Sequence, residues 1–266
     1  MENHFELAVQ RSLEMMRDNI GEDLTVDDMA RAAMFSKFHF TRVFQRVTGV
    51  SPGRFLSAMR LQRAKDLLLS TSMNVADISV RVGYNSVGTF STRFTRSVGL
   101  PPTEYRRMRG VSHLVHLNAE EHSPCRADGV VSGTLLVRPP AEIEVVFVGL
   151  FASRIPEGKP VRCTIMNGSG SFIIDKVPSG VWYLLCQGIP RRTGDLRGIG
   201  DCLSVAPFVA STGPIRVHSN SEAVAHVRLS PARVFDPPLL LALPDVRTTF
   251  STTHSRPHAG LLPQAA

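Results

Sequence analysis

The sequence predicts a chain of two domains, an all-α double helix-turn-helix followed by an all-β sandwich. Helical apolar spacing fills residues 1–109, and it repeats at an offset of 49 to 50 residues. Short apolar or alternating runs separated by Gly and Pro follow from residue 129. The 266 residues are enough for two domains of ordinary size.

The helices can be placed in order along residues 1–109. An apolar stripe at intervals of three and four residues marks the first helix, which stops at Gly21; its members are Phe5, Val9, Leu13, Met16 and Ile20. Thr25, with Asp28 three residues later, has the pattern of an N-cap before a second, short helix. Five more helices are expected over 36–49, 52–70, 75–82, 86–98 and from residue 101.

Two copies of one unit, a short helix, a turn and a second helix, explain the repeat. Asp28, Met29, Ala33 and Phe35 recur as Asp77, Ile78, Val82 and Tyr84, and Phe40, Phe44, Arg46, Gly49 and Pro52 recur as Phe90, Phe94, Arg96, Gly99 and Pro102. Core packing accounts for the repeated phenylalanines. The helix over 52–70 that joins the copies would be about 28 Å long, which approaches the roughly 34 to 36 Å between adjacent major-groove faces.

The remainder of the chain divides into a linker (110–128), a β-sandwich (129–235) and a flexible tail (236–266). Eight strands are expected, over 130–137, 143–151, 161–166, 172–177, 181–186, 203–208, 215–217 and 224–229. Trp182 and Tyr183 are neighbours on one strand and should face opposite sides, so one of them should be exposed. The tail is expected because Pro, Thr, Ser and His become frequent from Asp236 onward.

Charge is concentrated in one segment. Residues 36–109 hold thirteen Lys or Arg and three Asp or Glu, whereas residues 111–266 are nearly balanced. The basic segment is a candidate polyanion-binding face. No export signal or apolar run long enough to cross a membrane is visible, and the four cysteines form no CxxC pair, so we expect a cytoplasmic protein with reduced thiols and no membrane partner.

The second helix of each unit carries polar or basic residues opposite its apolar face. The first exposes Lys37, Phe38, Thr41, Arg42, Gln45 and Arg46, and the second exposes Val87, Gly88, Thr89, Thr92, Arg93 and Arg96. A helix-turn-helix places this face in the major groove. A solvated helix face would explain either copy alone. Two basic copies joined by one helix favour binding to double-stranded DNA.

The same residues resemble the AraC/XylS transcription regulators over residues 5–109. The matching positions are Ser36, Phe40, Arg42, Phe44, Gly49, Ser51, Pro52, Met59, Arg60, Leu61 and Ala64, followed by Gly83, Tyr84, Asn85, Ser86, Phe90, Ser91, Phe94, Gly99, Pro101, Pro102, Tyr105 and Arg106. The resemblance implies a seven-helix, two-unit DNA-binding domain in a transcription regulator. An activator is favoured over a repressor, with RNA polymerase as a further partner.

Carried over by position, the family's base-contacting places fall on Phe38, Thr41, Arg42, Val87, Gly88 and Thr92. Phosphate contacts are expected from Lys37, Arg46, Arg93 and Arg96. The second set departs from the family, which has longer polar side chains there and a basic residue where Thr92 stands. We therefore expect the first helix to read sequence, and the second to contact phosphates and thymine methyl groups. Met34 is a smaller departure, because the family favours a turn residue such as Gly there.

The domain order also departs from the family, which places the DNA-binding unit after the sensor. The run from Gly170 to Leu184 resembles the GxFxIxxVPxGxYxL pattern of carboxypeptidase-regulatory-like, prealbumin-type sandwiches. That resemblance implies a structural role, with Pro178, Ser179 and Gly180 forming a turn between paired strands. We expect this domain to sense an unknown small molecule or to contact a protein. The loop from Arg191 to Asp201, with Arg191, Arg192 and Arg197, is the place for an anionic ligand or acidic partner, although a solvated loop explains these residues better.

Two alternative functions remain open from the sequence. A DNA-binding architectural protein would carry the sandwich as a passive cap, whereas an enzyme or peptidase-accessory module would use it in catalysis. No HExxH, GxSxG, P-loop or dinucleotide pattern supports an enzyme, so we expect neither catalytic residues nor a cofactor. His113, His116, His122 and Cys125 have a spacing that could bind zinc, but chance explains it better.

Overall fold

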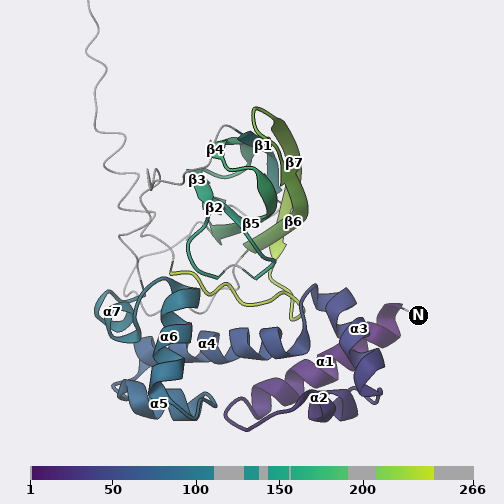
Figure 1. Cartoon of the computed structure of the whole chain (residues 1–266), viewed down its shortest axis with the longest axis vertical. Coiled ribbons are helices and arrows are strands. Elements are labelled where there is room, and N and C mark those ends of the chain that lie inside the picture. The colour runs from purple at the N-terminus through teal and green to yellow at the C-terminus, as the bar shows by residue number, and fades with distance from the viewer. Residues whose placement is uncertain (1, 111–128, 138–142, 156, 191–207, 243–266) are drawn as a thin grey trace, which may run out of the picture.

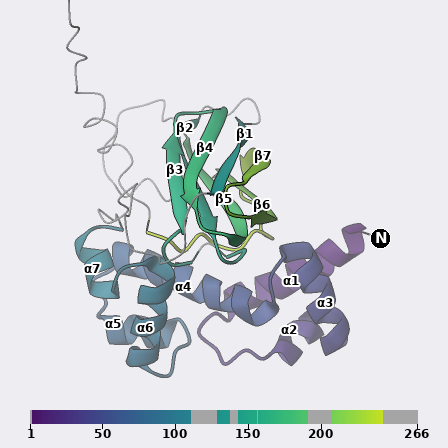
Figure 2. The same cartoon turned by 45° about the horizontal axis from the view of Figure 1, so that its top comes forward.

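The computed structural model describes residues 2–110, 129–137, 143–155, 157–190 and 208–242. Helices form one region and strands a second region beside it (Figures 1 and 2). The helices are α1 (Glu2–Asp18), α2 (Val26–Ala32), α3 (Lys37–Thr48), α4 (Pro52–Ser70), α5 (Val75–Arg81), α6 (Val87–Val98) and α7 (Pro102–Arg107). The strands are β1 (Gly129–Val137), β2 (Ile143–Phe151), β3 (Arg162–Met166), β4 (Gly170–Val177), β5 (Gly180–Pro190), β6 (Phe208–Val217) and β7 (Glu222–Pro231). All the helices that the sequence predicts are present.

The two copies of the repeated unit start with equivalent caps. Thr25 forms a capping box with Asp28, and these hydrogen bonds from Thr25 hold the pKa of the Asp28 carboxyl at about 2. Asn74 caps α5 by accepting a hydrogen bond from the backbone N–H of Asp77 at 2.8 Å. The turns that follow are also equivalent, because Met34 (φ 59°) and Gly83 (φ 81°) both adopt the left-handed conformation. Met34 thus occupies the position that favours glycine, and its side chain is 76% exposed.

Helix α4 is buried on several sides because it joins both units. Phe55 packs edge-on against Phe44 of α3 at a ring-centroid distance of 5.6 Å. At its other end, the backbone carbonyl oxygen of Leu68 accepts a hydrogen bond from Arg106 of α7 at 2.9 Å. Its side chains join a single hydrophobic core that runs through both units. A connector packed in this way holds the two units in a fixed relation.

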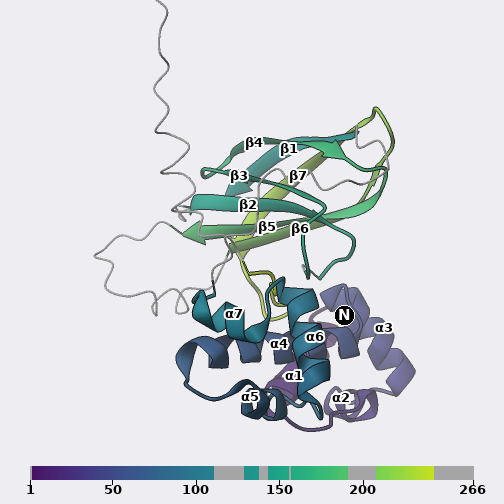
Figure 3. The same ribbon diagram turned by 60° about the vertical axis from the view of Figure 1, so that its left-hand side comes forward.

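The seven strands form one sheet in the order β3-β2-β5-β6-β7-β1-β4. Neighbouring strands are antiparallel except β1 and β7, which are parallel. The edge strands β3 and β4 lie side by side, so the sheet is nearly closed and barrel-like (Figure 3). The described strands form this single sheet in place of the two facing sheets that we predict. The apolar alternation is the same for both architectures, because either one encloses one face of each strand.

Two predictions about the run from Gly170 to Leu184 need correction. The turn at 178–180 joins β4 to β5, which are not neighbours in the sheet, so it does not connect paired strands. Instead the indole N–H of Trp182 donates to the carbonyl oxygen of Pro178 at 2.8 Å, and this bond fastens the turn to β5. Neither Trp182 nor Tyr183 is exposed. Trp182 packs against the core of the sheet, and the guanidinium of Arg154 lies over the Tyr183 ring at 6.0 Å.

The loop between β2 and β3 docks on the helices. The carboxylate of Glu157 accepts hydrogen bonds from Arg54 of α4 at 3.2 Å and from Ser97 of α6 at 3.1 Å. The backbone N–H of Gly158 donates to the carbonyl oxygen of Ser97 at 2.8 Å, and Ile155 belongs to the helical core. One loop of the β region therefore contacts both the connecting helix α4 and helix α6 of the second unit.

Residues 233–242, which we call the strap, lie between the two regions. The Lys65 ammonium donates to the carbonyl oxygen of Leu239 at 3.0 Å, and the N–H of Ala242 donates to the carbonyl oxygen of Val98 at 3.0 Å. Leu240 belongs to the helical core, whereas Leu241 packs with β2 side chains. The first residues of the segment that we expect to be a flexible tail are therefore buried at the junction.

We predict that Leu240→Ala lowers the free energy of unfolding by about 2 to 5 kcal/mol, because it leaves a cavity in the helical core. Leu240 is 1% exposed, whereas Leu136 on β1 is 51% exposed and provides the matched control. Urea titrations followed by far-UV circular dichroism would measure both variants. Equal effects of Leu136→Ala and Leu240→Ala would show that the strap does not complete the core.

Burial lowers the pKa of Lys65 to about 8, from the 10.5 of an exposed lysine. The folded protein therefore carries the full cost of the buried charge below pH 8, and it loses that cost as the pH rises from 8 to 10.5. We predict that Lys65→Met raises the free energy of unfolding by about 1 to 3 kcal/mol near pH 7, with a gain that shrinks above pH 8.

The test is a series of urea titrations from about pH 7 to 10. Lys159→Met removes an exposed lysine from the β2–β3 loop and should change stability little at any pH. A destabilised Lys65→Met variant throughout this range would mean that the hydrogen bond to Leu239 outweighs the cost of burying the charge.

Candidate nucleic-acid interface

Helix α3 presents the first predicted base-contacting face. Phe38 is 82% exposed, which is unusual for a large apolar side chain, and Arg42 lies one helical turn further along the same exposed face. Thr41 is half-buried, and its hydroxyl donates to the carbonyl oxygen of Lys37 at 2.9 Å. The opposite face of α3 is anchored by Phe40 and Phe44, both fully buried. The helix is thus held from behind, and Phe38 and Arg42 are exposed on its opposite face.

Helix α6 presents the second face. Val87 is 39% exposed, and Gly88 and Thr92 are exposed as well. Gly88 is the second residue of α6, so it lies in the first turn, where glycine costs a helix less than it does in the interior. Ser86 caps this turn by accepting a hydrogen bond from the N–H of Thr89 at 3.4 Å. This face is smaller and less polar than that of α3.

The predicted phosphate-contacting side chains of α3 already have partners within the protein. The Lys37 ammonium forms an ion pair with Asp27 at 2.8 Å, and the Arg46 guanidinium lies over the Phe5 ring at 5.8 Å. Both side chains are exposed. An exposed ion pair contributes about 0 to 1 kcal/mol, so Lys37 can exchange Asp27 for a phosphate at little cost.

The corresponding side chains of α6 diverge. The Arg93 guanidinium donates to the hydroxyl of Ser57 on α4 at 3.2 Å, so it points toward the connector between the units. Arg96 and Thr92 line one open groove beside α7. The last turn of α6, which includes Ser97, lies against Gly158 of the β region. Both arginines are exposed.

The β region leaves the predicted groove-facing ends of α3 and α6 uncovered. It contacts the C-terminal ends of both helices, through Arg154 beside Gly49 after α3 and through Glu157 at Ser97 of α6. The N-terminal halves carry Phe38 and Val87, and they lie away from this junction. Both recognition surfaces are therefore accessible in the docked arrangement.

No sequence pattern pointed to the residues that join the two regions. Arg54, Ser97 and Glu157 lie far apart in the chain and carry no motif, so only the folded arrangement brings them together. The zinc-like set from His113 to Cys125 and the loop from Arg191 to Asp201 lie outside the described residues. Within the described residues, no cluster of His, Cys, Asp and Glu side chains could hold a metal ion.

Comparison with known proteins agrees with this arrangement. Residues 29–108 match a family model described as a helix-turn-helix domain. The chain is 31% identical over 173 residues to the uncharacterized HTH-type transcriptional regulator YbfP of Bacillus subtilis, covering 64% of this chain and 56% of that protein. It is 32% identical over 98 residues to the lactose operon transcription activator of Staphylococcus xylosus, covering 37% of this chain and 35% of that protein.

Among solved structures, a transcriptional regulator from Chromobacterium violaceum, described by its AraC-type DNA-binding domain, is 29% identical. The match covers 39% of this chain and 93% of that chain, with a TM-score of 0.38. This chain spans about half of one curated relative and about a third of the other.

The helical region is therefore a helix-turn-helix DNA-binding domain of the type that transcription regulators carry. Its predicted similarity to the helix-turn-helix domains of transcriptional regulators is confirmed. The resemblance of the β region to carboxypeptidase-regulatory-like sandwiches stays a prediction, as do the individual DNA contacts.

We predict that Arg42→Ala costs about 1 to 3 kcal/mol on a specific site and relaxes the preference for particular base pairs. Arg96→Ala should instead weaken binding to all duplexes alike and reduce the slope of log K against log salt by about 1, because it removes a phosphate contact. Fluorescence anisotropy with specific and scrambled duplexes over a range of salt concentrations would measure both effects.

Arg216→Ala provides the control, because this exposed arginine lies on β6 of the other region. It should leave both affinities unchanged. An Arg42→Ala variant that lost affinity equally for specific and scrambled DNA would show that Arg42 does not read bases.

Proposed function

We propose that the protein is a sequence-specific transcription regulator that inserts α3 and α6 into two consecutive major grooves of promoter DNA. The observation that carries the proposal is the pair of recognition faces held on the single buried helix α4, both left exposed by the β region. At about 28 Å, the length of α4 is close to the spacing of adjacent grooves. One chain could then bind without a partner.

The two recognition helices make different kinds of contact with DNA. Helix α3 reads base pairs through Phe38, Thr41 and Arg42, of which Arg42 has the donors that suit guanine edges. Helix α6 places the apolar Val87 and the methyl group of Thr92 near thymine methyl groups, and Gly88 lets the DNA backbone approach closely. Lys37, Arg46, Arg93 and Arg96 supply contacts to phosphates. This division follows from the smaller, less polar face of α6.

The β region senses a small molecule or contacts a protein in this proposal, and activation through RNA polymerase is favoured over repression by the family resemblance. Its near-balanced charge makes a second DNA-binding surface unfavourable. No described helix is both long and apolar enough to cross a membrane. The architectural alternative, with a passive β cap, differs in one measurable respect, since it expects no change in transcription when the β region is altered.

The proposal predicts a monomeric complex with an asymmetric site. Selection of bound sequences from a random pool with the full chain should return two short conserved blocks about 10 bp apart, one helical turn of DNA. Hydroxyl-radical footprinting should then show both blocks protected on one face of the duplex. The stoichiometry, measured by light scattering of the complex, should be one chain per site.

A matched variant separates the two helices. Arg42→Ala should remove the sequence preference of one block and leave the other intact, whereas Arg216→Ala should leave both unchanged. A palindromic site bound by two chains, or protection of a single groove, would overturn the proposal that one chain spans two grooves.

A further inference from the structure

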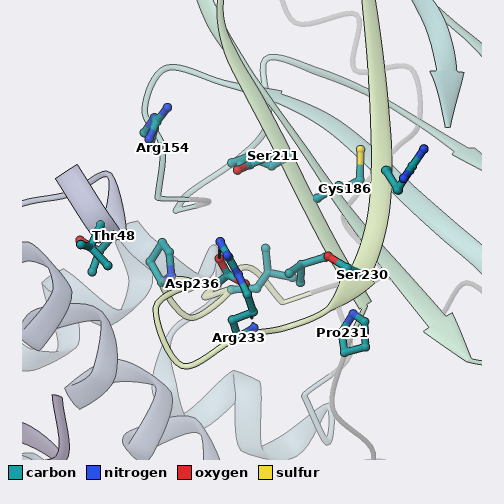
Figure 4. A pocket seen from close by; sticks show the side chains of 15 residues that line it. Thr48, Arg154, Cys186, Ser211, Ser230, Pro231, Arg233 and Asp236 are labelled. Carbon is teal, nitrogen blue, oxygen red and sulfur yellow. Dashed lines mark hydrogen bonds and ion pairs between the residues drawn. The ribbon is translucent and has the colours of Figure 1, made fainter. Parts of the chain in front are cut away.

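We propose that the cavity between the helical and β regions binds an organic anion, a carboxylate or phosphate monoester with an apolar body. Figure 4 shows this cavity, with Thr48 at its helical side and Cys186, Ser211 and Ser230 on the strands opposite. Anion binding as such depends on these lining residues alone. Its effect on DNA binding rests on the proposed function.

The cavity is of a size that suits a small molecule. Its volume is about 660 Å³, within the roughly 300 to 1,000 Å³ of ligand pockets in general. It lies where β6 and β7 diverge, since only Phe208–Pro231 and Val209–Ser230 are paired between these strands. Its walls come from the end of α3, the β2–β3 loop, β5, β6, β7 and the strap.

The charges of the residues that line the cavity favour an anionic ligand. Arg154, Arg228 and Arg233 line the cavity, and Asp236 is the only acidic residue among the lining side chains described. Asp236 is already engaged, because it accepts hydrogen bonds from the backbone and side chain of Arg233. Arg154 and Arg228 form no hydrogen bond or ion pair with the described residues. Two guanidinium groups therefore remain available for a carboxylate or phosphate.

The rest of the lining selects an apolar body. Leu185, Val209, Ala210, Pro231 and Leu239 contribute apolar surface next to these arginines. Cys186 lies at the β side, where burial raises the pKa of its thiol to about 12, so it is a neutral thiol at physiological pH. A small inorganic ion would satisfy the arginines and leave the apolar surface uncovered, so an amphipathic anion fits better.

The position of the cavity connects a ligand to the recognition helices. Thr48 is the last residue of α3, and Arg154 lies three residues before Glu157 on the same loop. Glu157 in turn bonds Arg54 of the connecting helix α4 and Ser97 of α6 in the second unit. A ligand that engages Arg154 thus acts on the loop that contacts α4 and α6, and it can change how the β region sits on these helices.

The first experiment measures binding to the full chain by isothermal titration calorimetry. The probes are 1-naphthoate, octanoate and phenyl phosphate, with 1-naphthamide as the neutral analogue and inorganic phosphate as the ion without an apolar body. We expect at least one organic anion to bind one site with a Kd below about 1 mM. The amide should bind at least about tenfold more weakly because it carries no charge for the arginines, and inorganic phosphate should do so because it leaves the apolar surface uncovered.

Substitutions of the lining arginines test whether the anion binds in this cavity. Arg154→Ala and Arg228→Ala should each weaken the binding of that anion about tenfold, whereas Arg216→Ala on β6 should change it less than twofold. All three arginines are exposed, so the folds should survive, and circular dichroism would check this. Absence of saturable binding by all three organic anions, equal binding of the amide, or equal losses in all three variants would overturn the proposal.

The second experiment separates this proposal from the proposed function. The affinity for the selected duplex should change at least about threefold when the bound anion saturates the chain, and in Arg228→Ala the same change should need about tenfold more anion. Anion binding with no specific DNA binding would refute the proposed function and leave the site standing. Specific DNA binding without anion binding would refute the site alone. Binding of both without mutual influence would overturn the coupling through Glu157.

Discussion

The packing of α4 on several sides at once is the constraint on which the remaining arrangement depends. Because apolar side chains of this helix meet α3 at one end and α7 at the other, neither unit can turn about it without opening the shared core. The strap covers a further part of α4, where the carbonyl oxygen of Leu239 receives the ammonium of the buried Lys65. A charged group in such a place is retained at a cost in stability, and its hydrogen bond to Leu239 restricts how the strap can lie.

The β region adds a second support to the same connector. The contact between the β region and α4 is polar. It is also partly exposed, because Arg54 and Glu157 pair at 3.2 Å with both side chains accessible to solvent. Such pairs contribute little to stability, so the contact can be broken and remade more readily than the apolar core beneath it. The packing of the helices along α4 is therefore firm, whereas the contact between the β region and α4 is weaker. That weaker contact is the one that a bound molecule could shift.

The helical region could be predicted in detail because its signals are local. Each of these signals acts within a few residues of the chain: the apolar stripe that ends at Ile20, the capping pair of Thr25 and Asp28, and the turn residue Gly83. The closure of the sheet and the junction could not be predicted. Glu157 and Leu239 look like an ordinary loop and an ordinary tail in the sequence, and their partners lie 60 to 174 residues away. The DNA contacts stay predictions, which rest on the repeat and the family resemblance.

The strap has a consequence for how the chain is made. The helical segments leave the ribosome more than a hundred residues before Leu240 and Ala242, which complete their core. During that interval the newly formed helices expose the apolar surface that the strap later covers, and the contacts that close it span most of the chain. Contacts of such long range form slowly. Synthesis of the last fifth of the chain thus sets the time at which the DNA-binding region acquires its final packing.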